Sequence, residues 1–180
     1  GLVDWILSDN SQLKKTVIDF CSGSGCIAVI IKLKRKKWHV IALEKSKKAI
    51  ELAKLNSSRH SAKINYIHAD IFSSNEYDEI DIIISNPPYV VESQRKSMKS
   101  NVLNFEPENS IFVSDENPLI FYKRIFDISK TKLKTGGFIY FEINPKFKNP
   151  LISLSMKYQF SNYELKKDIF KRNRYIKFQK

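Results

Sequence analysis

Four consecutive residues, Asn86-Pro87-Pro88-Tyr89, follow directly after an apolar run over residues 80–85. The run is rich in isoleucine, which is typical of a parallel strand buried on both faces, so the four residues are expected just past a strand's carboxyl end, where open α/β sheets bind ligands. Proline fixes its own φ and holds the preceding residue extended, which makes a stiff loop with fixed backbone carbonyls. Such a loop can grip a planar NH2 group, so the pattern points to methyl transfer onto a planar nitrogen. A proline-rich turn that merely closes a core strand is the alternative.

A glycine loop, Cys21-Ser22-Gly23-Ser24-Gly25, follows an expected strand that ends near Asp19. Glycine permits a tight turn and a close approach of the backbone to a ligand. A nucleotide-phosphate loop is the alternative. However, no Gly-Lys-Ser/Thr follows, and the third glycine of the dinucleotide fingerprint is absent.

Acidic residues stand at the ends of the next two expected strands as well. Glu44 can accept both hydroxyls of a ribose, although an acid at the start of a helix is an ordinary feature. Asp70, with Ile71 beside it, could accept an adenine amino hydrogen. Acids at three successive strand ends and a Gly-x-Gly turn predict a site for an adenosine with an amino-acid tail.

Apolar runs and helical patterns alternate from Thr16 onward, as in βαβ units around a parallel sheet. Ser46 can cap a helix, Pro118 can open another, and 135–137 should turn the chain into a strand. The segment 90–115 is long and polar, and we interpret it as a flap facing the substrate. Strands are expected at 16–20, 39–43, 64–68, 80–85, 138–143, 163–166 and 175–178, and helices at 26–33, after Ser46, after Pro118 and at 150–158.

Composition suits a single domain, since the chain has 180 residues of which 42% are hydrophobic. No apolar stretch approaches the roughly twenty residues of a membrane span and no signal-peptide pattern opens the chain, so we expect a soluble cytoplasmic protein without membrane association. The chain opens on Gly1 and runs straight into a helical pattern, from which we expect it to be part of a longer protein.

The formal charge of +12 is compatible with nucleic-acid binding. However, 25 of the 31 basic residues are lysine, in a chain also rich in isoleucine and asparagine, so an AT-rich genome would produce the same charge without a partner. We therefore expect no stable binding of nucleic acid. The two cysteines, Cys21 and Cys26, are interpreted as small buried residues, and the three histidines lack metal-ligand spacing, so no metal site is predicted.

These residues resemble the class I S-adenosylmethionine-dependent methyltransferases, and more closely the family that methylates the side-chain nitrogen of a glutamine in class I peptide chain release factors. The resemblance covers almost the whole chain. The blocks that carry it are 19–28, Glu44, 85–90, 105–108 with 111–113, 118–125 and 136–143.

The resemblance implies an α/β, Rossmann-like fold with a mostly parallel seven-stranded sheet and helices on both faces. Residues 1–180 would be the catalytic domain, and the family's amino-terminal helical domain would lie outside them. The cofactor would be S-adenosyl-L-methionine, giving S-adenosyl-L-homocysteine, and the protein is expected to be a monomer that acts on release factors. The implied cofactor-binding residues are Asp19, Cys21, Ser22, Gly23, Ser24, Gly25, Glu44, Asp70, Ile71 and Asn86.

The implied acceptor is the amide of a glutamine in a Gly-Gly-Gln motif. The Asn86 side-chain oxygen and the Pro87 carbonyl are expected to accept its two N–H hydrogens, while Tyr89 packs against the flat amide, which makes these three the catalytic residues. Pro88 and Glu106 complete the expected substrate site. Alternatives that remain open are a glutamine of a ribosomal protein, an adenine N6 or guanine N2 of nucleic acid, and a non-catalytic adaptor that keeps the fold.

Overall fold

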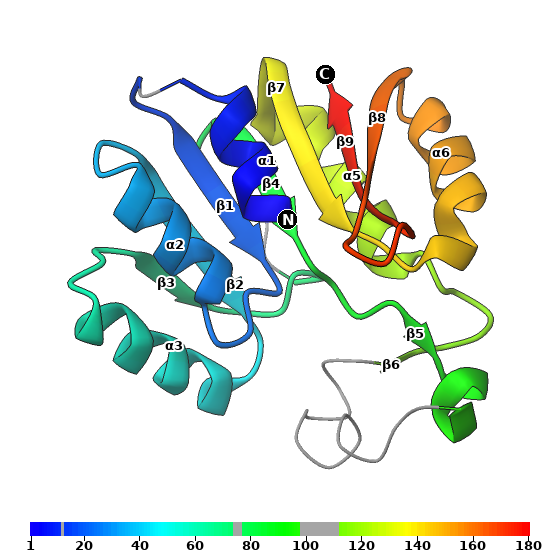
Figure 1. Ribbon diagram of the computed structural model, residues 1–180, viewed down its shortest axis with the longest axis horizontal. Coiled ribbons are helices and arrows are strands. Elements are labelled where there is room, and N and C mark those ends of the chain that lie inside the picture. The colour runs from blue at the N-terminus through cyan, green and yellow to red at the C-terminus, as the bar shows by residue number, and fades with distance from the viewer. Residues whose placement is uncertain (12, 74–76, 98–111) are drawn as a thin grey trace.

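The computed structural model of the protein describes residues 1–11, 13–73, 77–97 and 112–180, and its centre is a seven-stranded sheet (Figure 1). The strand order is β3-β2-β1-β4-β7-β9-β8, parallel from β3 to β7, with β9 antiparallel to both of its neighbours. This confirms the mostly parallel sheet expected from the sequence. The strands are β1 (Thr16–Phe20), β2 (His39–Glu44), β3 (Asn65–His68), β4 (Ile80–Ser85), β7 (Leu133–Glu142), β8 (Asn162–Lys167) and β9 (Asn173–Gln179).

Helices pack on both faces of this sheet because successive strand side chains point to opposite sides. In β1, Val17 belongs to the core shared with α1 and α2, whereas Ile18 belongs to the core shared with α5 and α6. α3 lies beside α2 and contacts β2 and β3. The helices are α1 (Leu2–Asp9), α2 (Cys26–Lys34), α3 (Lys47–Arg59), α5 (Ile120–Lys132) and α6 (Lys148–Lys157), with short 3-10 helices η1 (Glu92–Ser97) and η3 (Pro145–Phe147).

Local sequence signals explain where several of these elements begin. The Ser46 hydroxyl accepts the Ala49 N–H at 3.3 Å, so the expected cap of α3 is confirmed. β7 begins at Leu133, earlier than expected, because Gly136 adopts a φ of 76° within a strand that shifts its register against β4. The glycines therefore make an irregularity inside β7 rather than a turn ahead of it.

The segment expected to form a flap contains regular structure at both of its ends. β5 (Val90–Val91) pairs in parallel with β6 (Phe112–Val113), and the Ser93 N–H donates to Asp115 at 3.0 Å. Figure 1 places β5, β6 and η1 beyond the edge where the parallel strands end. The flap interpretation stays a prediction, since 98–111 lie outside the described residues.

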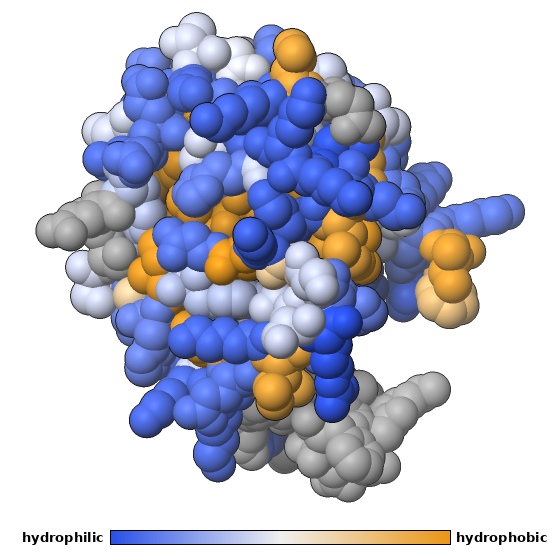
Figure 2. All heavy atoms as spheres, turned by 90° about the vertical axis from the view of Figure 1, so that its left-hand side faces the viewer, coloured by the Kyte–Doolittle hydropathy of each residue, from blue (hydrophilic) through white to orange (hydrophobic). Residues whose placement is uncertain are grey.

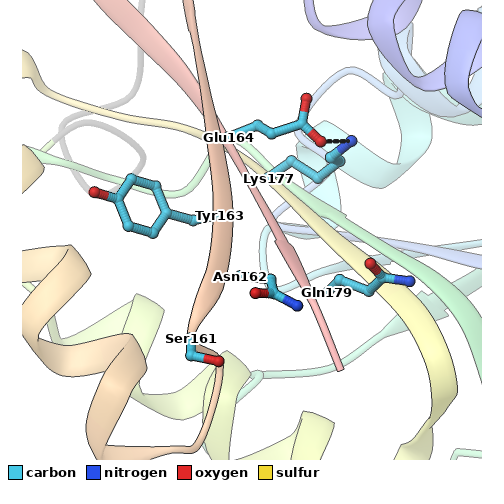
Figure 3. Close-up of a pocket in the computed structure, with 6 residues that line it drawn as sticks. All are labelled: Ser161, Asn162, Tyr163, Glu164, Lys177 and Gln179. Carbon is cyan, nitrogen blue, oxygen red and sulfur yellow. Dashed lines mark ion pairs between the residues drawn. The ribbon is translucent and has the colours of Figure 1, made fainter.

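The surface around α2 and α3 is mostly hydrophilic, with small separate apolar areas (Figure 2). A polar hollow of about 220 Å³ lies over β8 and β9, where Glu164 pairs with Lys177 (Figure 3). It contains none of the residues singled out from the sequence. Among the described residues, no helix has the length and apolar character needed to cross a membrane.

Candidate active site

The predicted chemistry is concentrated at one edge of the sheet. β1 pairs in parallel with β2 on one side and with β4 on the other, so Phe20 lies between Leu43 and Ser85. Glu44 ends β2 opposite His68 of β3. The loops that leave these strands therefore meet where the order of strands reverses, which is the usual ligand crevice of an open α/β sheet.

The two glycines of the β1–α2 loop have different tasks. Both adopt left-handed backbone, with φ of 53° at Gly23 and 74° at Gly25. A Cβ at Gly25 would lie 2.9 Å from the Cβ of Ala53 in α3, so this glycine lets two helices approach. A Cβ at Gly23 would meet nothing within 4 Å of the described atoms, so Gly23 leaves open space above the loop.

Glu44 connects this loop to the start of α3. One carboxylate oxygen accepts the Gly23 N–H at 2.9 Å, and the other accepts the Ser46 N–H at 2.8 Å. Each oxygen keeps acceptor capacity for a further donor, because a carboxylate has about four lone-pair positions. The structure thus brings the glycine loop and the predicted ribose acid into contact.

Two side chains at the start of the loop have buried polar atoms without a hydrogen-bond partner among the described residues. They are Asp19, through both carboxylate oxygens, and Ser22, through its hydroxyl. Burial raises the pKa of Asp19 to about 8, and the charge of Glu44 adds to this, while the Ala28 N–H favours the ionised form without forming a hydrogen bond.

The surroundings of Cys21, like those of Asp19, disfavour a negative charge. Burial raises the pKa of its thiol, and the nearby carboxylates of Glu44 and Asp19 raise it further. Cys21 is half-buried, whereas Cys26 is exposed, so the expectation that both are buried is wrong for Cys26. Cys26 is the first residue of α2 and lies outside the buried face of that helix, which is made by Ala28, Val29 and Ile31.

Asp70 and Ile71 lie at the end of β3 as predicted. Asp70 accepts the Phe72 N–H at 3.0 Å and pairs with Lys45 at 2.8 Å. Partial burial opposes ionisation of Asp70, but its pKa is lowered overall by Lys45 and the Phe72 N–H. Ile71 is buried, and its carbonyl accepts Arg124 Nε at 2.8 Å, which fixes the backbone there.

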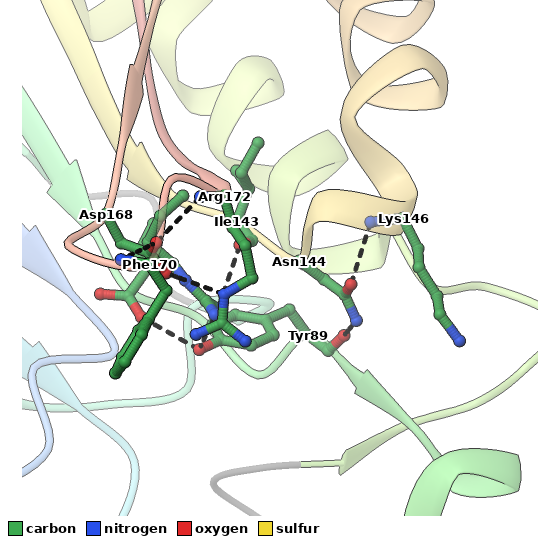
Figure 4. Close-up of polar contacts among 9 residues, drawn as sticks. Tyr89, Ile143, Asn144, Lys146, Asp168, Phe170 and Arg172 are labelled. Atoms are coloured by element: carbon green, nitrogen blue, oxygen red, sulfur yellow. Dashed lines mark hydrogen bonds and ion pairs between the residues drawn. The ribbon is translucent and has the colours of Figure 1, made fainter.

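The Asn86–Tyr89 turn leaves β4 at the same edge. The Asn86 side chain is exposed, while Pro87 and Pro88 are buried, which leaves the asparagine free to meet a ligand from a fixed backbone. The Tyr89 hydroxyl donates to Glu142 Oε1 at 3.0 Å, and its carbonyl accepts Asn144 Nδ2 at 3.3 Å (Figure 4).

Glu142 and Arg174 are site residues that the sequence interpretation missed. Burial raises the pKa of Glu142, and the Tyr89 hydroxyl and Arg174 oppose that shift. The Arg174 guanidinium lies 6.0 Å from the centre of the Tyr89 ring. Glu142 could have been found from the sequence, because it is an acid at the carboxyl end of a strand, as Asp19 and Glu44 are. No feature of the sequence singled out Arg174.

A cavity of about 450 Å³ opens beside Tyr89. It is bounded by Glu142 at the end of β7 and by the turn between β8 and β9. The residues that line it are Gly1, Tyr89, Glu142, Asp168, Ile169, Phe170, Arg172, Arg174 and Tyr175.

One predicted substrate residue, Glu106, lies outside the described residues. In the parts of the chain that are described, no group of three or more His, Cys, Asp or Glu side chains could hold a metal ion.

This sheet order with a glycine loop, strand-end acids and an Asn-Pro-Pro-Tyr turn defines a Rossmann-like class I methyltransferase fold. A methyltransferase from Pyrococcus furiosus superposes with a TM-score of 0.71 over 98% of this chain and 80% of its own, at 14% sequence identity. Residues 3–106 match the model of the methyltransferase small domain. The chain belongs to that family.

Two curated relatives align with nearly the whole chain, and both are named release factor glutamine methyltransferase. The protein of Flavobacterium psychrophilum is 38% identical over 98% of this chain, and that of Bacteroides thetaiotaomicron is 36% identical over 97%. This chain spans only 64% and 63% of their lengths.

Proposed function

We propose that this protein transfers a methyl group from S-adenosylmethionine to the side-chain amide nitrogen of a glutamine in the Gly-Gly-Gln motif of class I release factors. The observation that carries the proposal is the Asn86–Tyr89 turn, a stiff loop with an exposed amide, at the same edge as the glycine loop and Glu44. The names of the two curated relatives support the same substrate.

The residues at this edge suit the proposed cofactor. Glu44 has acceptor capacity left for ribose hydroxyls, and the space above Gly23 is open. The unpartnered Asp19 carboxyl has hydrogen-bonding capacity left for a ligand, and the negative charge of Glu44 near Cys21 favours a cationic one. When bound, S-adenosylmethionine supplies an electrophilic methyl group on a positively charged sulfur. Asp70, Ile71, Ser22 and Ser24 complete the proposed binding residues.

The task of the Asn86–Tyr89 turn is to orient a weak nucleophile. An amide lone pair is delocalised into the carbonyl, so the nitrogen must be held in one direction and shielded from water. Asn86 Oδ1 and the Pro87 carbonyl accept the two N–H hydrogens, and the Tyr89 ring covers the flat amide. Positioning of this kind lowers a barrier by about 7 kcal/mol in favourable cases. No strong base is needed first, because the nitrogen becomes acidic once it is methylated.

The charges around the candidate site favour a protein acceptor over a nucleic acid. Lys45 pairs with Asp70 at 2.8 Å, and Arg172 and Arg174 both contact Asp168, at 3.1 and 3.5 Å. A nucleic-acid phosphate would have to compete with these carboxylates for each cation. This arrangement argues against an adenine or guanine acceptor.

Mass spectrometry of a purified release factor after incubation with the protein and S-adenosylmethionine tests the proposal. The expected product is one added methyl on the Gly-Gly-Gln glutamine, with none on duplex DNA, ribosomal RNA or ribosomal proteins offered in parallel. A methyl group on one of those acceptors alone would contradict the proposed substrate.

Two variants separate the role of the Asn86–Tyr89 turn from that of the cofactor-binding residues. Asn86→Ala is expected to lower kcat by roughly 10²–10³-fold with cofactor affinity nearly unchanged, because it removes an oriented acceptor where charge develops. Glu44→Ala is expected chiefly to weaken cofactor binding. Calorimetric titration with S-adenosylhomocysteine and steady-state kinetics measure the two effects, and an Asn86→Ala protein with normal kcat would refute the assignment.

A further inference from the structure

The turn between β8 and β9 is unusually rich in hydrogen bonds for an exposed turn. Asp168 accepts the backbone N–H groups of Phe170 and Arg172 at 2.9 and 3.0 Å, and its own N–H donates to the Arg172 carbonyl at 2.9 Å. Lys171 completes the turn with a φ of 61°. One carboxylate therefore fixes the backbone of the whole turn.

This fixed turn presents two large apolar side chains to solvent. Ile169 is 91% exposed and Phe170 is 69% exposed. The Arg172 guanidinium lies 5.0 Å from the centre of the Phe170 ring, and Phe170 belongs to neither of the two hydrophobic core clusters. A preformed turn with an exposed aromatic residue binds a partner at low entropic cost, because little remains to be ordered.

The turn is continuous with the proposed acceptor site. Ile169 and Phe170 line the same cavity of about 450 Å³ as Tyr89 and Glu142. Figure 4 shows Phe170 and Arg172 beside Asp168. Arg174 joins Asp168 to the Tyr89 hydroxyl, with contacts of 3.5 and 3.4 Å. A substrate polypeptide whose glutamine contacts Tyr89 must lie along this turn or along the opposite wall of the cavity.

We propose that the β8–β9 turn and this cavity form a docking subsite for the polypeptide segment next to the acceptor glutamine, with Ile169 and Phe170 contacting an apolar side chain of that segment. The inference rests on the proposed function and adds the surface by which the acceptor chain is recognised. The cations in the cavity are already paired with Asp168, which suits an uncharged peptide better than a phosphate.

The test compares Ile169→Ala, Phe170→Ala and the double variant with Leu13→Ala. Leu13 is 75% exposed and precedes β1, at the edge of the sheet opposite the site, so its truncation is a matched removal of an exposed apolar side chain. Steady-state methylation of a purified release factor gives KM and kcat, and calorimetry gives the affinity for S-adenosylhomocysteine.

The double variant is expected to raise the KM for the release factor about tenfold, with kcat, cofactor affinity and the melting temperature unchanged, since truncating the anchor side chains of an interface weakens binding by this factor or more. Leu13→Ala should match the wild type. If the wild type methylates the release factor and the double variant has the same KM, the docking subsite is refuted and the proposed function is not. If the wild type methylates no release factor, both are refuted.

Discussion

At the scale of single residues, the candidate site depends on carboxylates that hold a neighbouring side chain or the loop backbone in place. Tyr89 is held by Glu142, and Glu44 holds Gly23 and Ser46. Each of these carboxylates ends a parallel strand, so the sheet itself fixes its position. The orientation of the Asn86–Tyr89 turn is therefore inherited from β7 as well as from β4.

We expect Glu142 to be a positioning residue that acts through Tyr89. Tyr89→Phe removes the hydroxyl donor and Glu142→Met removes the acceptor, and each is expected to lower kcat about tenfold with the cofactor affinity unchanged. Because both variants delete the Tyr89–Glu142 hydrogen bond, the double variant should be little worse than either single variant. Tyr122→Phe is the control, since its hydroxyl donates to the Glu142 carbonyl at 3.0 Å rather than to Tyr89. Fully additive effects in the cycle would contradict the coupling.

Asp19 should make the stability of the protein depend on pH. Its folded-state pKa of about 8 lies above the ordinary aspartate value near 4, so between these values the native state keeps a proton that the unfolded chain has lost. Stability is therefore full below the unfolded pKa and falls as pH rises toward the folded pKa.

Asp19→Asn should remove that pH dependence. Between about pH 5 and about pH 8 the variant is expected to gain on the order of a few kcal/mol relative to the wild type, measured by urea unfolding without cofactor. All other titratable groups are shared by the two proteins and cancel in the difference. Parallel pH profiles for the two proteins would show that Asp19 is not the group responsible.

At the scale of elements, the site is built where loops leave a parallel sheet, and the β1–α2 loop shows how one turn serves packing and binding together. Gly25 faces Ala53 of α3, while Gly23 faces open space. The two glycines share left-handed backbone, so the difference between them lies in what surrounds each one.

Replacing each glycine by alanine should separate these tasks. Strain at positive φ is expected to destabilise every such variant by about 1 kcal/mol. Gly25→Ala should lose more, because its Cβ would also lie 2.9 Å from Ala53. Gly23→Ala should weaken cofactor binding as well. Gly136→Ala is the control for strain alone, with a φ of 76° and nothing within 4 Å, and equal cofactor affinities for Gly23→Ala and Gly136→Ala would contradict the role of Gly23.

At the scale of the whole molecule, the sequence predicted features that depend on contiguous residues and missed those that depend on residues far apart in the chain. The run from Ile80 to Ser85 and the residues after it predict a strand and its end, so the parallel strands and the acids behind them were found. The Tyr89–Glu142 contact joins residues 53 positions apart, and Arg174 reaches Tyr89 over 85. No periodicity encodes such contacts, because the first depends on β7 pairing with β4 and the second on β9 returning between β7 and β8.

The net charge of +12 is also a property of the whole molecule, and its effect should depend on salt. Weak, delocalised attraction to nucleic acid falls steeply as salt rises, whereas docking through apolar and hydrogen-bonded contacts does not. We expect duplex DNA to be retained by the protein at low salt and to be released by about 150 mM salt. Excess DNA at that concentration should leave methyl transfer to a release factor unchanged.

The effect of DNA on activity is measured by radiolabelled methyl transfer to a release factor, with and without competitor DNA, across a salt series. Lys45→Ala and Lys37→Ala provide a matched pair, because Lys45 pairs with Asp70 beside the site and Lys37 lies far from it between α2 and β2. Diffuse attraction predicts that both variants weaken retention of DNA equally. Inhibition that persists at the higher salt and is relieved only by Lys45→Ala would place a nucleic acid in the active site, and the acceptor would then have to be a base.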